Sequence, residues 1–157
     1  MLQQIATQSK TVQQNMSDIV WAIRPDNEKL ENLLVRMREY AAQTLEPLHI
    51  RTAIAIEENL LNKTLPLAYR KEVLLLYKEA INNIAKHAGA TGVDINIRRQ
   101  AQLFVMTIKD NGRWKGNGTT SGTGLQSMLQ RAKTMGGELN LEHGDSGTTV
   151  QLLAPLP

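Results

Sequence analysis

Cysteine is absent from the 157-residue sequence, which excludes a disulfide scaffold, a thiolate zinc site and a cysteine nucleophile. No apolar run approaches the roughly 20 residues that a membrane-spanning helix needs. The first residues also lack the basic and then apolar layout of a signal peptide. We therefore expect a cytoplasmic location for this chain, with an inner-membrane anchor in a longer parent protein left open.

Charge of one sign is not concentrated anywhere in the sequence. The 18 basic and 15 acidic residues give a net charge of +3, and charged residues make up 21% of the chain, which is ordinary for a globular domain. The basic residues are scattered rather than clustered, so we expect no nucleic-acid partner.

The first segment carries a narrow apolar seam at alternating spacings of three and four residues. Its members are Leu2, Ile5, Ser9, Val12, Met16, Ile19 and Ile23. This spacing predicts a coiled-coil or bundle helix over residues 1–24, which Pro25 ends. An amphipathic helix that packs on its own domain would show the same pattern.

The rest of the chain alternates between helical and strand periods. Apolar spacing predicts helices over 25–48, 68–87 and 125–135, and strands near 50–56, 93–97, 103–108, 138–142 and 148–153. Consecutive strands joined by short turns form hairpins, so the sheet should be mixed. We expect an α+β fold, a two-layer sandwich of helices on a mixed β-sheet.

The polar face of the helix predicted over 68–87 carries the first candidate site. Glu79, Asn83 and Lys86 are spaced at i, i+4 and i+7, and His87 flanks them. A carboxylate, an amide oxygen and an ammonium group suit a magnesium–phosphate ligand. A solvated helix face would contain the same residue types.

Two further segments contain residues that can contact a ligand. Asp110 and Gly112 follow a strand, where a carboxylate can accept from an exocyclic amine, although a plain turn has the same composition. The segment 121–125, Ser-Gly-Thr-Gly-Leu, opens a helix and can bind an anion through free backbone N–H groups. A flexible linker with an N-cap is the alternative.

The order of these features is more specific than any one of them. The stretches 79–88, 110–112 and 122–128 resemble the ATP-binding domain, of the Bergerat-type fold, shared by gyrase, heat-shock chaperone, histidine-kinase and mismatch-repair ATPases. Within that superfamily the chain is similar to two-component sensor histidine kinases of the nitrate-sensor-like subgroup. The resemblance implies three parts: a second helix of a dimerisation hairpin (1–24), a linker helix (25–48) and the ATP-binding domain (49–157).

The resemblance also implies roles for individual residues. Asn83 matches a Mg²⁺ ligand and Glu79 its acidic partner, a general base or water-orienting group. Asp110 matches the carboxylate that reads the adenine amino group. The other cofactor-binding positions implied are Lys86, His87, Gly112, Gly122, Thr123, Gly124, Leu125 and Thr148. The family pattern has a second glycine where this chain has Trp114.

The implied activity is transfer of the γ-phosphoryl group of ATP, with Mg²⁺, to a histidine. The three histidines, His49, His87 and His143, all lie outside the predicted dimerisation helix, so the acceptor is expected outside this fragment. The implied partners are a response regulator, to which the phosphoryl group passes, and a second copy bound through the N-terminal helix. A stand-alone ATPase of the same superfamily and a degenerate dimerising interaction module remain alternatives.

Overall fold

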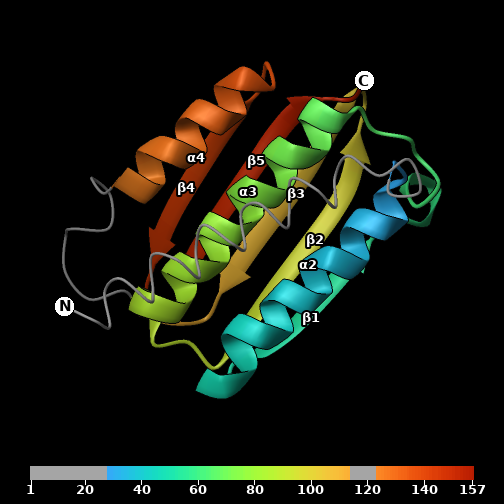
Figure 1. Cartoon of the computed structure of the whole chain (residues 1–157). Coiled ribbons are helices and arrows are strands. Elements are labelled where there is room, and N and C mark those ends of the chain that lie inside the picture. Colours follow the sequence, from blue (N-terminus) through green and yellow to red (C-terminus); the bar gives the residue numbers. More distant parts are fainter. Residues whose placement is uncertain (1–27, 114–122) are drawn as a thin grey trace, which may run out of the picture.

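The computed structural model describes residues 28–113 and 123–157 of the chain. These residues form one five-stranded sheet with strand order β1-β2-β3-β5-β4 (Figure 1). The strands are β1 (Arg51–Ile56), β2 (Gly92–Gln100), β3 (Leu103–Asp110), β4 (Glu138–Gly144) and β5 (Gly147–Pro155). β1 and β2 are parallel, whereas the other neighbours are antiparallel, so the predicted mixed sheet is confirmed.

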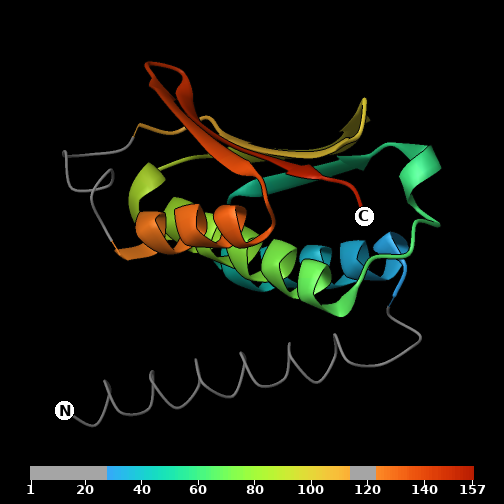
Figure 2. The ribbon, with the colours of Figure 1, turned by 90° about the horizontal axis from the view of Figure 1, so that it is seen from above.

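The helices lie together on one face of this sheet, as Figure 2 shows. They are α2 (Leu30–Leu45), α3 (Leu67–Asn83) and α4 (Thr123–Thr134), with short helical turns at Glu46–Leu48, Glu58–Leu60 and Ile84–Ala88. The α+β two-layer sandwich expected from the sequence is therefore confirmed. The opposite sheet face carries the alternate strand residues, such as the exposed Asp94 and Asn96 of β2.

The core lies between the two layers. The apolar stripe along α3 and the turn after it is buried throughout: Val73, Tyr77, Ala80, Ile81, Ile84 and Ala88. On the α4 side, Met128 and Ala132 are buried, whereas Leu129 is 43% exposed. His49, just before the strand predicted near 50–56, adopts a left-handed conformation (φ 58°), and β1 begins at Arg51.

The helix expected as a linker is part of the core layer. The buried face of α2 consists of Leu30, Leu33, Leu34, Met37, Ala41 and Leu45. The Tyr77 hydroxyl of α3 donates to the Met37 carbonyl at 2.8 Å, and the Tyr40 hydroxyl of α2 donates to Asn82 Oδ1 at 2.6 Å. These two hydrogen bonds hold α2 against α3, the helix that carries Glu79 and Asn83.

Several sequence predictions concern residues outside the described ranges. They include the dimerisation helix over 1–24, the glycine-rich segment up to Gly122, and Trp114. Among the described residues, no helix is both long and apolar enough to cross a bilayer.

Candidate functional site

The start of α4 contacts the polar face of α3. A β-carbon added at Gly124 would overlap Glu79 Oε1 and lie 3.5 Å from Asn83 Oδ1. Glycine at this position therefore allows the α4 backbone to approach both side chains. The two residues predicted from i, i+4 spacing thus face the helix that the glycine-rich segment opens, and both are half-buried.

The end of α3 departs from regular helix. Ile84–Ala88 forms a π-helical turn that Gly89 ends in a left-handed conformation (φ 57°). Lys86 and His87 lie in this turn, and both are exposed. Because the turn is wider than an α-helical one, the i+7 spacing from Glu79 does not define the stripe on which Lys86 lies.

The Asp110-Asn111-Gly112 segment is more than a plain strand-end turn. Asp110 is 1% exposed and its Oδ1 accepts from the Gly112 N–H at 2.9 Å. A β-carbon at Gly112 would overlap the Ala88 carbonyl oxygen, so the turn fits closely against the end of the π-helical turn. Asn111 Oδ1 accepts from the N–H groups of Thr91 (2.9 Å) and Gly92 (3.0 Å), which anchors the turn to the start of β2.

The beginning of β5 supports the same carboxylate. Lys109 pairs with Thr149, so the next residues along the two strands, Asp110 and Thr148, lie across from each other. Gly147 has φ 134°, and a β-carbon there would overlap the Asp110 carbonyl oxygen. Thr148 is only 2% exposed. The structure thus brings Thr148 beside Asp110, and Gly147 is a site residue that the sequence analysis missed.

A narrow pocket connects these features. It is lined by Ala80, Asn83, Ile84, Ile108, Asp110, Leu125, Met128, Leu141 and Val150. Sheet register places Ile108, Val150 and Leu141 side by side, so they form an apolar floor on three adjacent strands. The space open to water in it is about 10 Å³, so the lining side chains nearly fill the pocket.

The lining defines the chemistry of a suitable ligand. One carboxylate and one amide are set among apolar side chains, as in pockets where a few polar groups orient a largely apolar ligand. The Asp110 carboxylate only accepts hydrogen bonds, so its partner must present an N–H or O–H group. A flat heteroaromatic base with an exocyclic amine meets both requirements.

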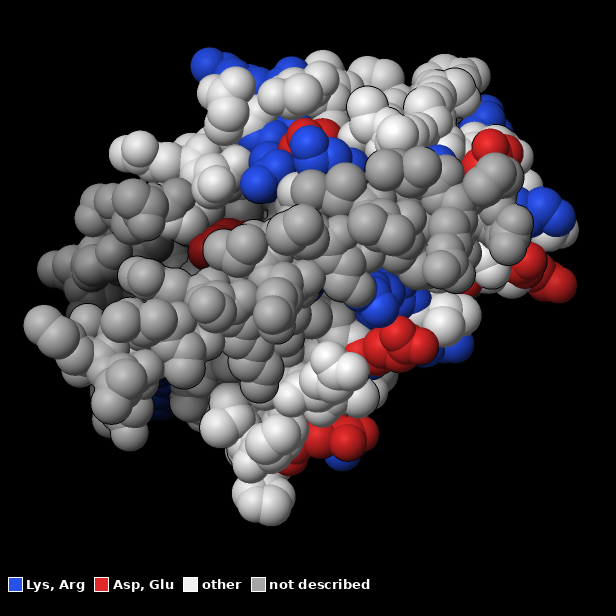
Figure 3. All heavy atoms as spheres, viewed as in Figure 1, with Lys and Arg blue, Asp and Glu red and all other residues white. Residues whose placement is uncertain are grey.

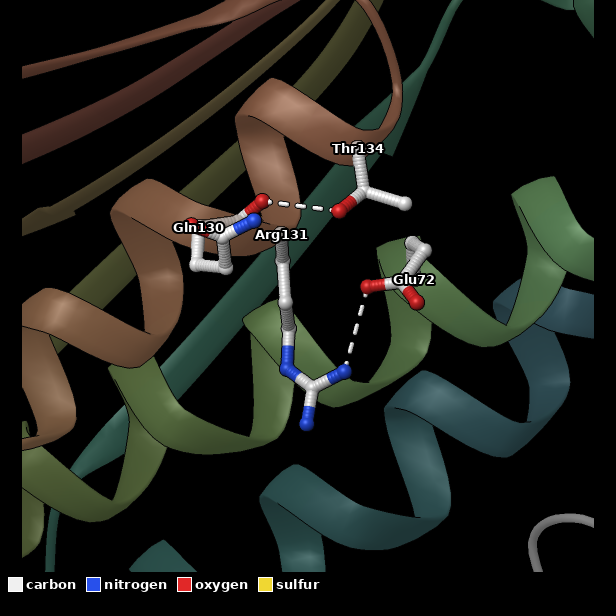
Figure 4. A network of polar contacts seen from close by, with 4 residues as sticks. All are labelled: Glu72, Gln130, Arg131 and Thr134. Atoms are coloured by element: carbon white, nitrogen blue, oxygen red, sulfur yellow. Dashed lines mark hydrogen bonds and ion pairs between the residues drawn. The ribbon is translucent and has the colours of Figure 1, made fainter.

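An ion pair holds the far end of α4 on α3. Arg131 Nη1 lies 3.1 Å from Glu72 Oε2, as the close view shows (Figure 4). Glu72 precedes Glu79 by seven residues on α3, and Arg131 follows Gly124 by seven on α4, so the two helices run antiparallel. Gly124 and Arg131 therefore mark two ends of one helix contact.

The surface around the helices carries both signs of charge. In Figure 3 acidic and basic side chains lie next to each other on the part of this face that the structure describes. No group of three or more His, Cys, Asp or Glu suited to a metal ion occurs within residues 28–113 and 123–157.

The other predicted positions are placed as follows. Thr123 begins α4 and Leu125 lines the pocket, whereas Gly122 lies outside the described residues. His143, which the sequence analysis did not include in the site, has its Nδ1 atom 3.1 Å from Thr148 Oγ1. No spacing in the sequence predicts this contact, because it depends on the pairing of β4 with β5.

Comparison with known proteins agrees with this geometry. A family model described as the histidine kinase-like ATPase domain matches residues 41–152. Sensor histidine kinase DesK of Bacillus subtilis is 24% identical over 156 residues, which is 98% of this chain and 41% of that protein. The chain thus spans less than half the length of this relative.

Solved structures share the fold. Histidine kinase AdeS of Acinetobacter baumannii matches with a TM-score of 0.72 and 12% identity, covering 99% of this chain and 81% of that chain. The histidine kinase domain of a blue-light activated histidine kinase, EL346 of Erythrobacter litoralis, matches with a TM-score of 0.67 and 20% identity, covering 79% and 61%. Since the family model covers well over half of the sequence, the chain belongs to the histidine kinase-like ATPase domain family.

Proposed function

We propose that this chain is the ATP-binding catalytic part of a sensor histidine kinase. It transfers the γ-phosphoryl group of ATP to a histidine outside these 157 residues, from which the group passes to an aspartate of a response regulator. The observation that carries the proposal is the buried carboxylate of Asp110, held by the Gly112 N–H at the edge of a narrow apolar pocket.

The proposed base-binding end consists of Asp110, Gly112 and Thr148. The Asp110 carboxylate accepts from the adenine amino group, a contact that guanine, with a carbonyl at that position, cannot make. Gly112 and Gly147 keep side-chain atoms away from the Asp110 turn, which leaves the carboxylate in its buried position. The apolar floor of Ile108, Val150 and Leu141 supports the flat face of the base.

The proposed phosphate end lies between α3 and α4. The amide oxygen of Asn83 and the carboxylate of Glu79 are oxygen donors of the type Mg²⁺ prefers, and Gly124 lets the α4 backbone approach them. When bound, Mg²⁺ neutralises charge on the β- and γ-phosphates. The first backbone N–H groups of a helix have no acceptor within the helix, so the Gly124 end of α4 suits an anion, while exposed Lys86 and His87 add basic side chains. The chain itself contributes positioning and charge rather than a covalent intermediate.

The remaining partners follow from the same proposal. Residues 1–24 pair with the same segment of a second copy and form the second helix of a dimerisation hairpin. None of the three histidines present is the acceptor, because none lies on the proposed dimerisation helix: His49 lies in a turn before β1, His87 in the π-helical turn after α3 and His143 in the β4–β5 hairpin. The catalytic part works on the cytoplasmic side of the membrane.

Incubation with ATP labelled at the γ-phosphate tests this activity. We expect reversible binding of labelled ATP in the presence of Mg²⁺, with no label retained covalently on the chain. Asn83→Ala should abolish the binding. The matched control is Asn96→Ala, which removes an exposed amide from the opposite face of the sheet and should leave binding unchanged. Covalent label on the chain, or binding that survives Asn83→Ala, would overturn the proposal.

A further inference from the structure

A row of polar residues crosses three neighbouring strands beside the pocket. His143 of β4 pairs directly with Thr148 of β5, and Thr148 lies opposite Asp110 of β3. Side chains two positions apart on a strand point to the same face, so this row lies on the helix-facing side with the apolar floor. The floor residues Leu141, Val150 and Ile108 are each two positions away. His143 thus completes a row that begins at the proposed adenine carboxylate.

The contact between His143 and Thr148 is fixed by the hairpin. Only Asp145 and Ser146 separate the paired residues Gly144 and Gly147, so the turn is short and a slip in register would move every side chain to the other face. His143 Nδ1 lies 3.1 Å from Thr148 Oγ1. Thr148 is 2% exposed, whereas the histidine is exposed, so the hydroxyl has an outer partner at the protein surface.

We propose that His143 is a positioning residue of the nucleotide site, acting through the hydroxyl group of Thr148. This inference rests on the proposed function, because it assigns adenine to the pocket beside Asp110. A threonine hydroxyl donates one hydrogen bond and accepts others. His143 fixes which of these it offers to the base.

The groups around Thr148 decide in which direction its hydroxyl donates a hydrogen bond. Across the strand pair from Thr148 lies Asp110, whose carboxylate accepts hydrogen bonds, as the ring nitrogens of adenine would in the proposed complex. Thr148 must therefore donate inward and accept from outside. His143 meets this requirement as the Nδ1–H form, which donates to Thr148 Oγ1. The imidazole thereby directs the threonine hydrogen toward the base.

Calorimetric titration with ATP and with ITP, each with Mg²⁺, tests the proposal on the whole chain. The ring nitrogen next to the exocyclic group accepts a hydrogen bond in ATP and carries a hydrogen in ITP. We expect His143→Ala and His143→Gln to weaken ATP binding about three- to tenfold, the size of one net hydrogen bond, and to weaken ITP binding less. His143→Asn places its amide near the position of Nδ1 and should retain wild-type affinity within about twofold.

A second background separates this role from a general effect on folding. In Thr148→Val the hydroxyl is absent, so the further change His143→Ala should leave ATP affinity unaltered. Thermal unfolding without nucleotide should be the same for wild type and all His143 variants, since this side chain is exposed. A loss of ATP affinity in these His143 variants would then not be due to loss of structure.

The outcomes that contradict the two proposals differ. If wild type binds ATP and His143→Ala or His143→Gln binds it equally well, the role of His143 is wrong and the proposed function stands. The same conclusion follows if His143→Asn loses as much affinity as His143→Ala, or if both nucleotides lose affinity equally. If wild type binds no ATP, the proposed function itself is wrong, and the role of His143 with it.

Discussion

Gly124 at the start of α4 lies against the carboxylate of Glu79 on α3, so closely that no β-carbon fits between them. The obstructing atom is the end of a flexible side chain, not backbone. A larger residue at position 124 can therefore be accommodated only if Glu79 turns away. The contact links the glycine-rich opening of α4 with the proposed acidic group of the site.

Gly124→Ala should impair activity while leaving stability nearly unchanged. Alanine favours helix over glycine by about 1 kcal/mol, which offsets the cost of moving the Glu79 carboxylate. Displacement of a positioned group by about 1 Å can lower a rate by two orders of magnitude, so we expect at least a tenfold loss of phosphoryl transfer. Transfer to a supplied histidine-containing acceptor domain and thermal unfolding measure the two effects. Ser127→Ala, at an exposed α4 position, is the control; equal activity of both variants would refute the prediction.

Gly112→Ala should differ from Gly124→Ala in lowering stability as well as function. Its β-carbon would overlap the backbone of Ala88 and Ala90, which no side-chain rotation relieves. We expect a loss of about 1–3 kcal/mol in the free energy of unfolding, together with weaker ATP binding, because the Asp110 turn must move. Gly144→Ala is the control, since a β-carbon there meets its nearest neighbour, Gly147, at 3.8 Å. Denaturant titration of both variants measures the free energy of unfolding. A Gly112→Ala protein as stable as wild type would show that the Asp110 turn does not fit closely against the π-helical turn.

The Glu72–Arg131 pair should stabilise the α3–α4 contact. Its side chains are 14% and 30% exposed, so the pair is screened less than one on the open surface. Glu72→Gln and Arg131→Gln should each cost about 1 kcal/mol, and a double-mutant cycle should return a favourable coupling of about 0.5–1 kcal/mol. Additive losses in that cycle would show that the two residues act independently.

Two buried tyrosines should respond differently to removal of the hydroxyl. Tyr77 donates to the Met37 carbonyl, so Tyr77→Phe should cost about 1 kcal/mol. Tyr69 Oη is buried and finds no hydrogen-bond partner within the described part of the chain, so Tyr69→Phe should be neutral or stabilising. Urea titration at neutral pH compares the variants, and an equal loss from both would contradict the assigned contacts.

The same tyrosines predict the alkaline limit of stability. Burial raises the pKa of Tyr69, and burial followed by the proximity of Tyr40 raises the pKa of Tyr77. Above about pH 10 the unfolded chain loses these protons while the folded protein keeps them, so stability should fall as pH rises further. Below that pH the contribution is fully present. The double variant Tyr69→Phe/Tyr77→Phe should show a shallower alkaline decline, and an unchanged slope would contradict this cause.

Local pattern was sufficient to predict the elements and part of the site. The apolar stripe through Tyr77 and Ile81 and the alternation in β2 follow from periods of 3.6 and two, which hold whatever the elements pack against. The strand-end Asp-Asn-Gly motif drew attention to Asp110, but on its own it equally predicts a plain turn, and the adenine role proposed for Asp110 came from the family resemblance. Local pattern does not predict the exposure of Leu129, because this residue is at the edge of the α4 stripe.

The periodicity of the sequence does not predict contacts between segments that are far apart in the chain. The position of β5 between β3 and β4 sets the neighbours of Thr148, and a hairpin alone does not say on which side it joins the sheet. The π-helical turn after Asn83 has no recognisable sequence signature, so Lys86 was placed by the spacing of a regular helix. The fit of Gly147 against Asp110 required both strands to be in place.

The central claim is that Asp110 selects adenine in a nucleotide site. Calorimetric titration of wild type and Asp110→Asn with ATP and Mg²⁺ tests it most directly, because the amide keeps the side-chain shape and an oxygen for the Gly112 N–H. We predict that wild type binds ATP and that the variant binds it about tenfold to 100-fold more weakly, the value of a hydrogen bond to a charged group, without losing its cooperative thermal unfolding. Equal affinities, or no binding by wild type, would contradict the account.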